Sequence, residues 1–384
     1  RACIKRGITM RQLYSAFRPL PDRIRRYGFA SLAIALVIAV IALPSAAQAA
    51  SSNQLQITAM TYNLFQGSEL TEAISAATPA QFLAAVAEDY GEVQRTDFPE
   101  RAQAIAAEAQ SAAPDLIGLQ EAALWQTGPA SASFPPPPPV TVSYDFVKIL
   151  VDALNARGLH YAPVAVTTDF TVQGPGLFPD GFMNVQLTDR VAILARTDVP
   201  LTITDAQTGD YTHNTVISTL QGPVTLTEGW ASVDATLGHH TVRFVTTHLA
   251  DNSAAVGSAQ AAELVQGPLS TDLPVMMTCD CNADPTTATY AVLTAAGLKD
   301  SWAHAEPGQP GFTCCQDTTL QSALLNPTSA LASRIDYIFS RGGGLKATGD
   351  QIVGADPGGR SVPAGFWPSD HAGLIAELTQ GSPS

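Results

Sequence analysis

The sequence predicts an α/β sandwich, in which helices cover layers of β-sheet. Short runs rich in Val, Ile and Leu alternate with Ala-rich segments of helical length throughout residues 51–380. This interleaved order is typical of layered α/β proteins rather than of all-α or all-β ones. The hydrophobic content is 46% and the charged content only 14%. Such a composition can bury a large core and is not that of a disordered chain.

The expected strands are short apolar runs, each bounded by Gly, Pro, Asp or Asn. In chain order they are Leu55–Tyr62, Leu116–Gln120, Val191–Ala195, Val242–Thr247, Val275–Cys281, Ile335–Phe339 and Gly373–Leu378. The expected helices between them are Pro79–Tyr90, Phe98–Ala112, Tyr144–Arg157, Ser253–Gln266 and Thr286–Ala296. The last two have favourable starts, because Ser253 and the run Pro285-Thr286-Thr287 contain residue types that cap helix N-termini. No repeat or composition break divides the region, so we expect residues 51–384 to form a single domain.

The N-terminal segment has the features of an export signal. Arginines within residues 23–26 precede an uncharged apolar run, Tyr27–Leu43, and Ala47-Gln48-Ala49 follows it as a cleavage signature. A membrane anchor is the alternative, but the run is at the short end for spanning a bilayer. We therefore expect residues 1–50 to be a signal peptide and the mature protein to be secreted and extracellular.

Removal of residues 1–50 makes the chain more acidic. That segment holds 8 of the 20 Lys and Arg residues but one of the 34 acidic residues, so the remainder carries 12 basic and 33 acidic residues, a net charge of −21. Such a surface repels polyanions at long range, which disfavours a dedicated nucleic-acid binder without excluding a nuclease. The chain begins with Arg1, and Met10 would start a signal peptide of normal length, so residues 1–9 can lie outside the translated protein.

The cysteines suggest disulfide bonds. Apart from Cys3, which lies in the expected signal peptide, they are Cys279, Cys281, Cys314 and Cys315. An even number in an exported chain favours disulfides, whereas C-x-C followed by C-C is poor spacing for the alternative, a four-cysteine zinc site. Side chains alternate along a strand, so Cys279 and Cys281 should point away from the face that carries Asp280. We expect them to pair with Cys314 and Cys315, tying the following loop to the strand, with the connectivity open.

Polar side chains that can bind a hard cation or move a proton stand at the ends of the predicted strands. They are Asn63, Glu121, His248, Asp280, Asn282, Asp336, Asp370 and His371. Each alone has an ordinary explanation as a turn or cap residue. A layered α/β protein collects its functional residues at strand ends, however, so the whole set predicts one active site.

The motifs around these residues resemble a known superfamily. T-x-N, L-Q-E, T-H-L, D-x-N, R-I-D-Y and S-D-H occur in that order over residues 58–371. This ordered set resembles the endonuclease/exonuclease/phosphatase superfamily, which includes pancreatic deoxyribonuclease and neutral sphingomyelinases. Cys279 departs from the pattern, which usually has Gly before Asp-x-Asn, and should alter packing beneath the site. The resemblance implies a four-layered α/β sandwich, with two mixed β-sheets packed together and flanked by helices, as a single catalytic domain over residues 51–384.

The resemblance also implies a metal site and a water-activating group. Glu121 would bind Mg²⁺, with Asn63 and Asp370 in or near its coordination shell, and Mn²⁺ or Ca²⁺ could replace it. Mg²⁺ prefers few carboxylates, several waters and a substrate phosphate, which fits this set. Asp280 would orient or deprotonate the attacking water. Asn282 and Asn63 would hydrogen-bond the phosphate.

Two histidine–carboxylate pairs complete the expected site. His371 would pair with Asp336, which fixes the imidazole tautomer and stabilises its charge, and would act as general base or stabilise the phosphate charge. His248 would contact the phosphate and pair with Asp189 as the acid for the leaving oxygen, by similarity to the deoxyribonuclease-like branch. The alternative for Asp189 is a salt bridge with Arg190.

These features predict a secreted Mg²⁺-dependent phosphoester hydrolase, either a phosphodiesterase or a phosphatase, that is a monomer with no stable protein partner. The expected substrate is a phospholipid head group or another small phosphoester. A secreted endonuclease acting on DNA or RNA is the first alternative, and a non-catalytic binding protein on the same scaffold the second. A zinc hydrolase is disfavoured because no H-E-x-x-H motif occurs. Specificity should lie in variable loops around Ser131–Ser143 and Thr168–Leu187.

Overall fold

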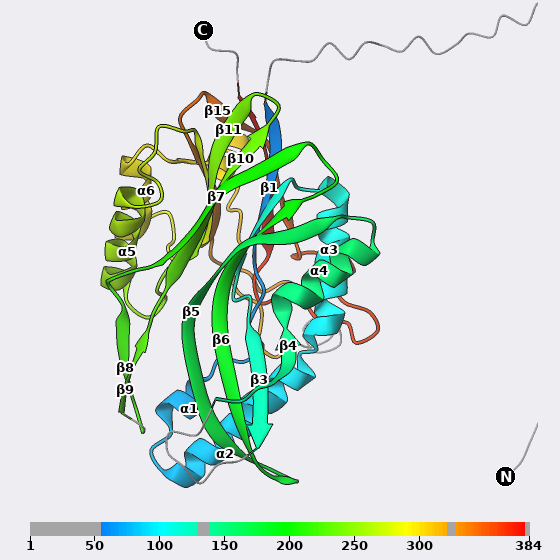
Figure 1. Cartoon of the computed structure of the whole chain (residues 1–384), viewed down its shortest axis with the longest axis vertical. Coiled ribbons are helices and arrows are strands. Elements are labelled where there is room, and N and C mark those ends of the chain that lie inside the picture. Colours follow the sequence, from blue (N-terminus) through cyan, green and yellow to red (C-terminus); the bar gives the residue numbers. More distant parts are fainter. Residues whose placement is uncertain (1–54, 130–137, 221, 321–327, 381–384) are drawn as a thin grey trace, which may run out of the picture. The chain divides into compact units, whose positions relative to one another are not determined.

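Figure 1 shows the computed structural model of the chain, which describes residues 55–129, 138–220, 222–320 and 328–380. These residues belong to one compact unit. The predicted signal peptide lies outside the described residues, as does the first half of the predicted loop Ser131–Ser143. Within the described ranges, the helices are all too short or too polar to cross a membrane.

The first sheet has eight strands in the order β15-β16-β1-β2-β6-β3-β4, with β5 paired to β6. Their bounds are β1 Gln56–Asn63, β2 Leu116–Gln120, β3 Leu124–Pro129, β4 Thr141–Asp145, β5 Tyr161–Phe178, β6 Gly181–Arg196, β15 Leu345–Val353 and β16 Gly373–Gln380. Only β1 and β2 run parallel, and the other pairs are antiparallel. The sheet is therefore mixed, with its parallel pair near the centre.

The second sheet has six strands in the order β13-β14-β12-β11-β10-β7. Their bounds are β7 Leu201–Asp210, β10 Gly229–Leu237, β11 His240–His248, β12 Val275–Asp280, β13 Lys299–Asp300 and β14 Asp336–Arg341. Here β11 and β12 form the parallel pair. A separate small hairpin joins β8, Thr215–Thr219, to β9, Gly222–Leu226. Each large sheet thus has one central parallel pair, so the carboxyl ends of β1, β2, β11 and β12 can face a common site.

Helices cover the outer face of each sheet (Figure 1). The helices are α1 Thr71–Ser75, α2 Pro79–Arg95, α3 Phe98–Ala112, α4 Phe146–Ala156, α5 Ala254–Gln266, α6 Ala288–Ala295 and α7 Ser301–Ala305, with a 3₁₀ turn at Pro357–Gly359. Side chains of α2, α3 and α4 pack with the first sheet. Those of α5 and α6 pack with the second. A third core cluster lies between the two sheets, so the predicted four-layered sandwich is confirmed.

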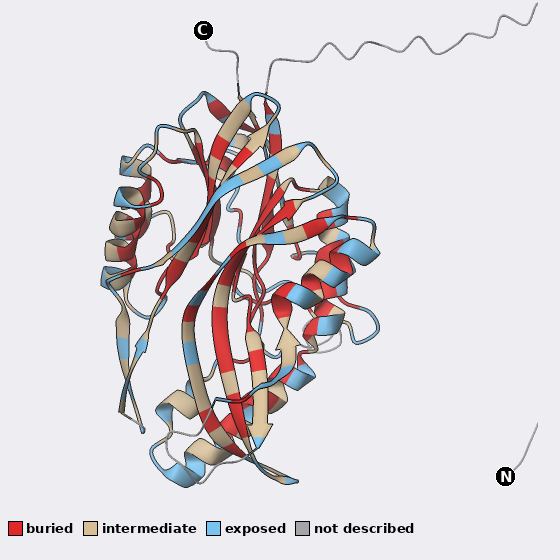
Figure 2. Cartoon of the chain, in the orientation of Figure 1, coloured by how far each residue is buried: buried red, intermediate tan, exposed pale blue. Residues whose placement is uncertain are grey.

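The strand residues alternate between these cores as a two-residue period requires. In β1, Ile57 and Ala59 face the other sheet, whereas Met60 and Tyr62 face the helices. Both faces of the central strands are therefore buried, which explains their nearly continuous hydrophobic runs. Figure 2 shows the same division, with buried strands inside helices whose outer faces are exposed. This packing leaves the strand ends as the places where polar side chains can meet.

The predicted strands and helices all occur, most with ends displaced by five residues or fewer, but the predicted strand Val191–Ala195 is only the last part of β6, which begins at Gly181. The prediction for Thr168–Leu187 was wrong: this segment forms most of the long β5–β6 hairpin instead of a loop. Gly174, Pro175 and Gly176 in β5 are residues that normally interrupt a strand. They are tolerated because β5 has its ladder on one side only, with β6, where Pro removes no required hydrogen bond.

Candidate active site

The predicted residues from the two sheets meet at Asn63, the last residue of β1. Its amide nitrogen donates hydrogen bonds to Glu121 Oε1 at 2.8 Å and to Asp280 Oδ2 at 2.9 Å. Its amide oxygen accepts from Phe65 N at 2.9 Å. Asn63 has no exposed surface, so it is a fixed link between the carboxylate that follows β2 and the one that ends β12. The structure thus brings together residues that lie 217 positions apart.

Glu121 turns its carboxylate towards solvent-accessible space. It follows β2 in a left-handed conformation, with φ of 49°, which is uncommon for a residue other than glycine and marks a constrained position. Its second oxygen accepts from Gln66 N at 2.7 Å. Each carboxylate oxygen can accept a further contact, since an ionised carboxylate has about four acceptor positions. Glu121 also lines a cavity, so a cation in the cavity can reach it.

Asp280 is the centre of the polar cluster. Its Oδ1 accepts from Asn282 N at 3.0 Å. Its Oδ2 lies 3.6 Å from His248 Nε2 and 3.7 Å from His371 Nδ1. Asn282, another left-handed residue with φ of 45°, donates to Leu249 O at 2.9 Å and contacts His248 Nε2 at 3.1 Å. Asn282 therefore holds His248 in place beside Asp280.

His371 and Asp336 form a hydrogen-bonded pair, which we call the closed pair. His371 Nδ1 lies 2.9 Å from Asp336 Oδ2, and the N–H of Asp336 donates to Thr313 Oγ1 at 3.2 Å. Burial raises the pKa of Asp336 to about 6. Burial opposes the charge on His371, but the carboxylates of Asp336 and Asp280 outweigh it and raise the pKa of His371 well above its ordinary value. These carboxylates therefore favour the charged form of His371, which faces the carboxylate cluster.

Asp370 lies next to the same cluster, on the side of the first sheet. The Ser369 hydroxyl is 2.8 Å from Asn63 O and 3.2 Å from Asp370 Oδ1, so it ties this segment to the end of β1. Burial raises the pKa of Asp370 to about 6, with His371 opposing the shift and Glu121 adding to it. Asp370 is thus close enough to Glu121 for the two carboxylates to repel each other.

Arg101 is a supporting residue that the sequence did not reveal. It is fully buried on α3, where its guanidinium donates to Leu64 O at 2.7 Å, to Pro368 O at 2.8 Å and to Phe65 O at 3.0 Å. Burial lowers its pKa to about 10, so it stays charged at neutral pH. It joins the end of β1 to the segment before Asp370. Within an Ala-rich helix, no local pattern marks one Arg as buried.

His248 and Asp189 are neighbours without a hydrogen bond. A ring nitrogen of His248 and carboxylate oxygens of Asp189 and Asp169 lie within 4.8 Å of one another, yet His248 Nδ1 and Asp189 Oδ1 are buried without a hydrogen-bond partner. Burial and the carboxylate of Glu121 raise the pKa of Asp189 to about 7. The alternative partner, Arg190, forms its salt bridge with Asp145 at 2.6 Å instead.

A cavity of about 630 Å³ opens beside these groups. One side of it is polar and includes Glu121, Asp189 and His248. Much of the rest is apolar, formed by Phe65, Phe82, Trp125, Phe170, Ile217 and Leu226 among others. The β5–β6 hairpin contributes to this wall, so the segment Thr168–Leu187, where we expected specificity to lie, does border the site.

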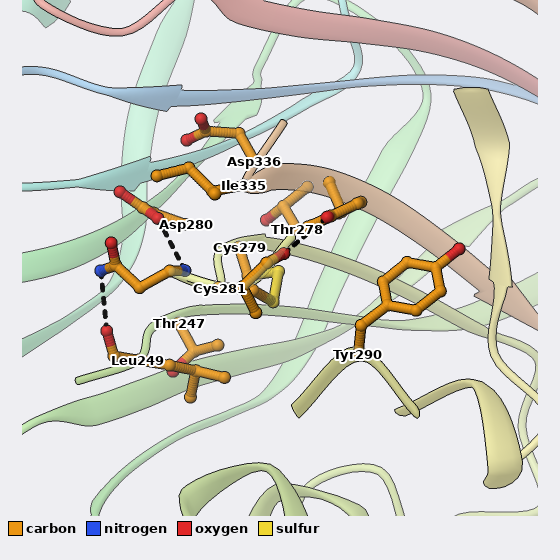
Figure 3. Close-up of a disulfide and its surroundings, with 12 residues drawn as sticks. Thr247, Leu249, Thr278, Cys279, Asp280, Cys281, Tyr290, Ile335 and Asp336 are labelled. Carbon is orange, nitrogen blue, oxygen red and sulfur yellow. Dashed lines mark hydrogen bonds between the residues drawn. A yellow bond between two sulfur atoms is a disulfide. The ribbon is translucent and has the colours of Figure 1, made fainter. Parts of the chain in front are cut away.

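The cysteines lie on two sides of this site: Cys279 and Cys281 pack in the core on the far face of β12, whereas Cys314 and Cys315 lie beside His371. The sulfur atoms pair within each short motif, Cys279 with Cys281 and Cys314 with Cys315, so the expected link from strand to loop is not formed. Cys279 and Cys281 can meet because residues two apart lie on the same face of a strand, and Cys314 and Cys315 are neighbours in the sequence. Figure 3 shows the Cys279–Cys281 disulfide near Tyr290, with the carboxylates of Asp280 and Asp336 pointing away from it. The loop is held instead by backbone bonds, such as Ala372 N to Thr313 O at 2.7 Å.

Known proteins match both the sequence and the fold. The endonuclease/exonuclease/phosphatase family matches residues 60–371. A search of curated protein sequences gave no match. A Bacteroides thetaiotaomicron protein of that family has 20% identity and a TM-score of 0.54 over 86% of this chain and 99% of its own. A mannosyl-6-phosphatase from the same organism has 20% identity and a TM-score of 0.52 over 84% and 99%.

A family protein from Bacteroides vulgatus has 14% identity and a TM-score of 0.52 over 85% of this chain and 100% of its own. At such identities these likenesses support the fold rather than a shared substrate. The family match covers the strand-end motifs from β1 to His371, the same residues that the structure gathers between the two sheets. The chain therefore belongs to the endonuclease/exonuclease/phosphatase family, whose members are metal-dependent hydrolases of phosphoesters or nucleases.

Proposed function

We propose that the chain is a secreted Mg²⁺-dependent hydrolase of small phosphoesters. The observation that carries the proposal is the arrangement around Asp280 Oδ2, which has Asn63 Nδ2 at 2.9 Å and a histidine on each side at 3.6 and 3.7 Å. A carboxylate between two histidines offers a proton acceptor with proton donors beside it. Phosphoester hydrolysis requires that combination, because a water must lose a proton and a leaving oxygen must gain one.

The residues present fit a hard divalent cation. Glu121 borders the cavity with acceptor positions to spare, and Asp370 lies close by, which is the oxygen-rich, carboxylate-poor set that Mg²⁺ prefers. When bound, such an ion would neutralise charge on the substrate phosphate. We assign Asn63 to orienting Glu121 and Asp280, because both hydrogens of its amide nitrogen are engaged by these two carboxylates.

The protein groups then divide the proton transfers among themselves. Asp280 orients the attacking water and accepts its proton. His371, kept charged by Asp336, stabilises the negative charge that develops on the phosphate oxygens. His248, held by Asn282 with Asp189 behind it, donates the proton to the leaving oxygen. The two histidines differ in environment, which suits different roles at one pH.

The cavity favours a substrate with an apolar substituent over a nucleic acid. Among the described residues that line it, none is Lys or Arg, whereas aromatic and aliphatic side chains are numerous. A strand of nucleic acid requires cationic contacts to its backbone, and the chain beyond residue 50 has a net charge of −21. We propose a phospholipid head group or a small phosphodiester with an apolar group as the substrate class.

A panel of substrates tests this function. The full chain with Mg²⁺ should hydrolyse bis(4-nitrophenyl) phosphate and phospholipid vesicles faster than plasmid DNA, and EDTA should abolish the activity. Glu121→Gln should abolish the activity and with it the response to Mg²⁺, whereas Glu108→Gln, in α3 and outside the cluster, should leave the activity in place. Preferential cutting of DNA would favour the endonuclease alternative. No hydrolysis with any substrate or divalent metal would favour the non-catalytic binding protein.

Export is tested separately. If residues 1–50 are a signal peptide, expression of the full chain in a bacterium should place a protein starting near Ser51 outside the cytoplasm. Mass spectrometry of the culture medium and of the cell fractions gives the N-terminus of each form. Recovery of the intact N-terminal segment in the membrane fraction would support the anchor alternative instead.

A further inference from the structure

Cys314 and Cys315 lie beside His371, and their sulfur atoms are bonded to each other. A disulfide stabilises a fold mainly by closing a loop of the unfolded chain, and the gain grows with the length of that loop. A bond between neighbouring residues closes almost no loop. The presence of two cysteines next to His371 therefore needs an explanation other than stability.

The backbone holds the two cysteines against His371 without help from their sulfur atoms. On one side, Gln316 N donates a hydrogen bond to Asp370 O at 2.7 Å. On the other side, Cys314 N donates to Ser333 O at 3.0 Å. Because these bonds join main-chain atoms, the cysteine side chains stay beside His371 whether or not the disulfide is intact.

Of the two disulfides in the described ranges, the one at Cys315 is open to solvent. Cys315 is exposed, whereas Cys279 and Cys281 are 0% and 1% exposed. Exposed disulfides are the ones that thiols reduce readily. A dithiol that attacks Cys315 would become a disulfide itself and leave two free thiols, at Cys314 and Cys315. The buried pair should remain oxidised under the same conditions.

We propose that Cys314, Cys315 and His371 form a binding site for a soft divalent cation, such as Zn²⁺ or Cd²⁺, once their disulfide is reduced. One ligand atom of each residue lies within 4.8 Å of the other two. Bonds from Zn²⁺ to sulfur and to nitrogen are about 2.3 and 2.0 Å long, so its ligands are at most about 4.6 Å apart. Small side-chain movements therefore complete the site.

The ligand types separate this site from the Mg²⁺ site at Glu121. Thiolates select Zn²⁺ and similar soft ions, whereas Mg²⁺ prefers oxygen ligands. Each thiol releases its proton when the ion binds. With two thiolates and one imidazole, a fourth position stays open for water, as tetrahedral Zn²⁺ allows. Mg²⁺ in excess should therefore leave a soft ion in place here.

Asp336 prepares His371 for this role. His371 Nδ1 lies 2.9 Å from Asp336 Oδ2, so Nε2 is the ring nitrogen left for an ion. A carboxylate on the other nitrogen is the usual partner of a metal-binding histidine, because it fixes the ring and raises its basicity. The ion would replace a proton on His371 and remove the charged imidazolium from the reaction. This inhibition rests on the proposed function, whereas the binding site itself does not.

Ultraviolet absorption tests the site without any assay of hydrolysis. The full chain is treated with a phosphine, which reduces the Cys314–Cys315 disulfide and becomes a phosphine oxide, and is then titrated with Cd²⁺ in excess Mg²⁺. Cadmium bound to thiolates gives a charge-transfer band, which Mg²⁺ does not. We expect the band to saturate at one Cd²⁺ per chain in the reduced protein and to be absent from the oxidised protein.

Cys315→Ser is the decisive variant, because this side chain is exposed and its replacement should not disturb folding. It should weaken Cd²⁺ binding at least about tenfold, since even indirect metal contacts are worth about 10- to 100-fold in affinity. His371→Ala should weaken binding by at least the same factor while the band remains at saturation. The matched control is the double variant Cys279→Ser/Cys281→Ser, which removes the other disulfide and should bind Cd²⁺ like the wild type. If that variant does not fold, mass spectrometry of the alkylated, reduced wild type replaces it and should find label on Cys314 and Cys315 alone.

Cadmium should also inhibit the reduced enzyme. Hydrolysis of bis(4-nitrophenyl) phosphate by the reduced wild type should fall about 10²-fold or more, the effect expected when His371 is lost. The oxidised wild type and Cys315→Ser should keep their activity. Equal Cd²⁺ binding by the oxidised and reduced protein, or unchanged affinity in His371→Ala, would overturn the site. Absence of hydrolysis with every metal would count against the proposed function alone, because the binding is measured by absorption.

Discussion

The two histidines beside Asp280 have very different surroundings. His371 is hydrogen-bonded to Asp336 at 2.9 Å, and the backbone of Asp336 is in turn held by Thr313. His248 faces Asp189 and Asp169 without a hydrogen bond on Nδ1. The imidazole of His371 and the carboxylate of Asp336 are hydrogen-bonded to each other. Around His248, by contrast, carboxylate oxygens of Asp189 and Asp169 have no hydrogen-bond donor. A histidine next to a carboxylate in the fold is therefore not always hydrogen-bonded to it, because the surrounding groups decide whether the two side chains meet.

The difference originates in what packs around each histidine. His371 is bridged by backbone to the loop at Cys314, which fixes its position between two elements. His248 ends β11 and borders the cavity, and the long β5–β6 hairpin brings Asp169 and Asp189 against it. His371 is thus enclosed by protein groups, whereas His248 borders the cavity.

Replacing His371 should have the largest effect. His371→Ala should lower kcat/KM for bis(4-nitrophenyl) phosphate about 10²- to 10⁴-fold, the range for loss of a proton-transfer or charge-stabilising side chain. His304→Ala, on α7 outside the cluster, is the control and should leave the rate unchanged. A His371 variant of near wild-type activity would remove the closed pair from the mechanism.

Replacing Arg101 should destabilise the segment that carries the closed pair. Arg101→Met leaves the carbonyls of Leu64, Phe65 and Pro368 without their donor, and we expect a loss of about 3 kcal/mol in the free energy of unfolding. Arg95→Met removes only the exposed ion pair with Glu88 and should cost less than about 1 kcal/mol. Urea unfolding measures both, and equal losses would contradict the structural role of Arg101.

Replacing Asp336 and Asp189, the carboxylates beside His371 and His248, compares the two histidine–carboxylate pairs directly. Asp336→Asn removes a charged hydrogen bond worth about 1.5–3 kcal/mol, so kcat/KM should fall roughly 10- to 100-fold. Asp189→Asn, in Mg²⁺ alone, should reduce kcat/KM less, because no hydrogen bond joins Asp189 to His248. Equal losses, or a larger loss for Asp189→Asn, would show that the second pair closes when substrate binds.

Glu108 should have the smallest effect on hydrolysis, and it gives a baseline for buried acids outside both pairs. Burial raises its pKa from 4.5 to about 8, although Tyr62 donates to it at 3.1 Å. The folded state therefore holds a proton that the unfolded state releases. This stabilisation is present below about pH 4.5 and is lost as the pH rises towards 8, at about 1.4 kcal/mol per pKa unit.

Glu108→Gln keeps the neutral shape and should flatten this fall in the free energy of unfolding between pH 4.5 and 8. Glu88→Gln, which is exposed on α2, is the control and should leave the slope unchanged. A wild-type slope that persists in Glu108→Gln would assign the dependence to the carboxyls near the histidines.

Much of the fold could be predicted from local sequence patterns. The predicted helix Phe98–Ala112 matches α3, because Asp97 caps it and Pro99 stands in its first turn. The predicted strand Leu116–Gln120 matches β2. The β5–β6 hairpin was missed, because Gly and Pro residues hide an edge strand whose pairing is not local. The expected disulfide link between strand and loop also depended on a distance that no local pattern contains.

The sequence by itself determined which chemical groups stand at the strand ends, because hydrophobic runs and their polar boundaries are properties of neighbouring residues. Only the tertiary structure decided how these groups meet. It placed Asn63 between Glu121 and Asp280, buried Arg101 beneath the site, and brought Asp189 and Asp169 up to His248. The physical reason is that hydrogen bonding, burial and the pKa shifts they cause depend on distances across two packed sheets, which the order of residues does not specify.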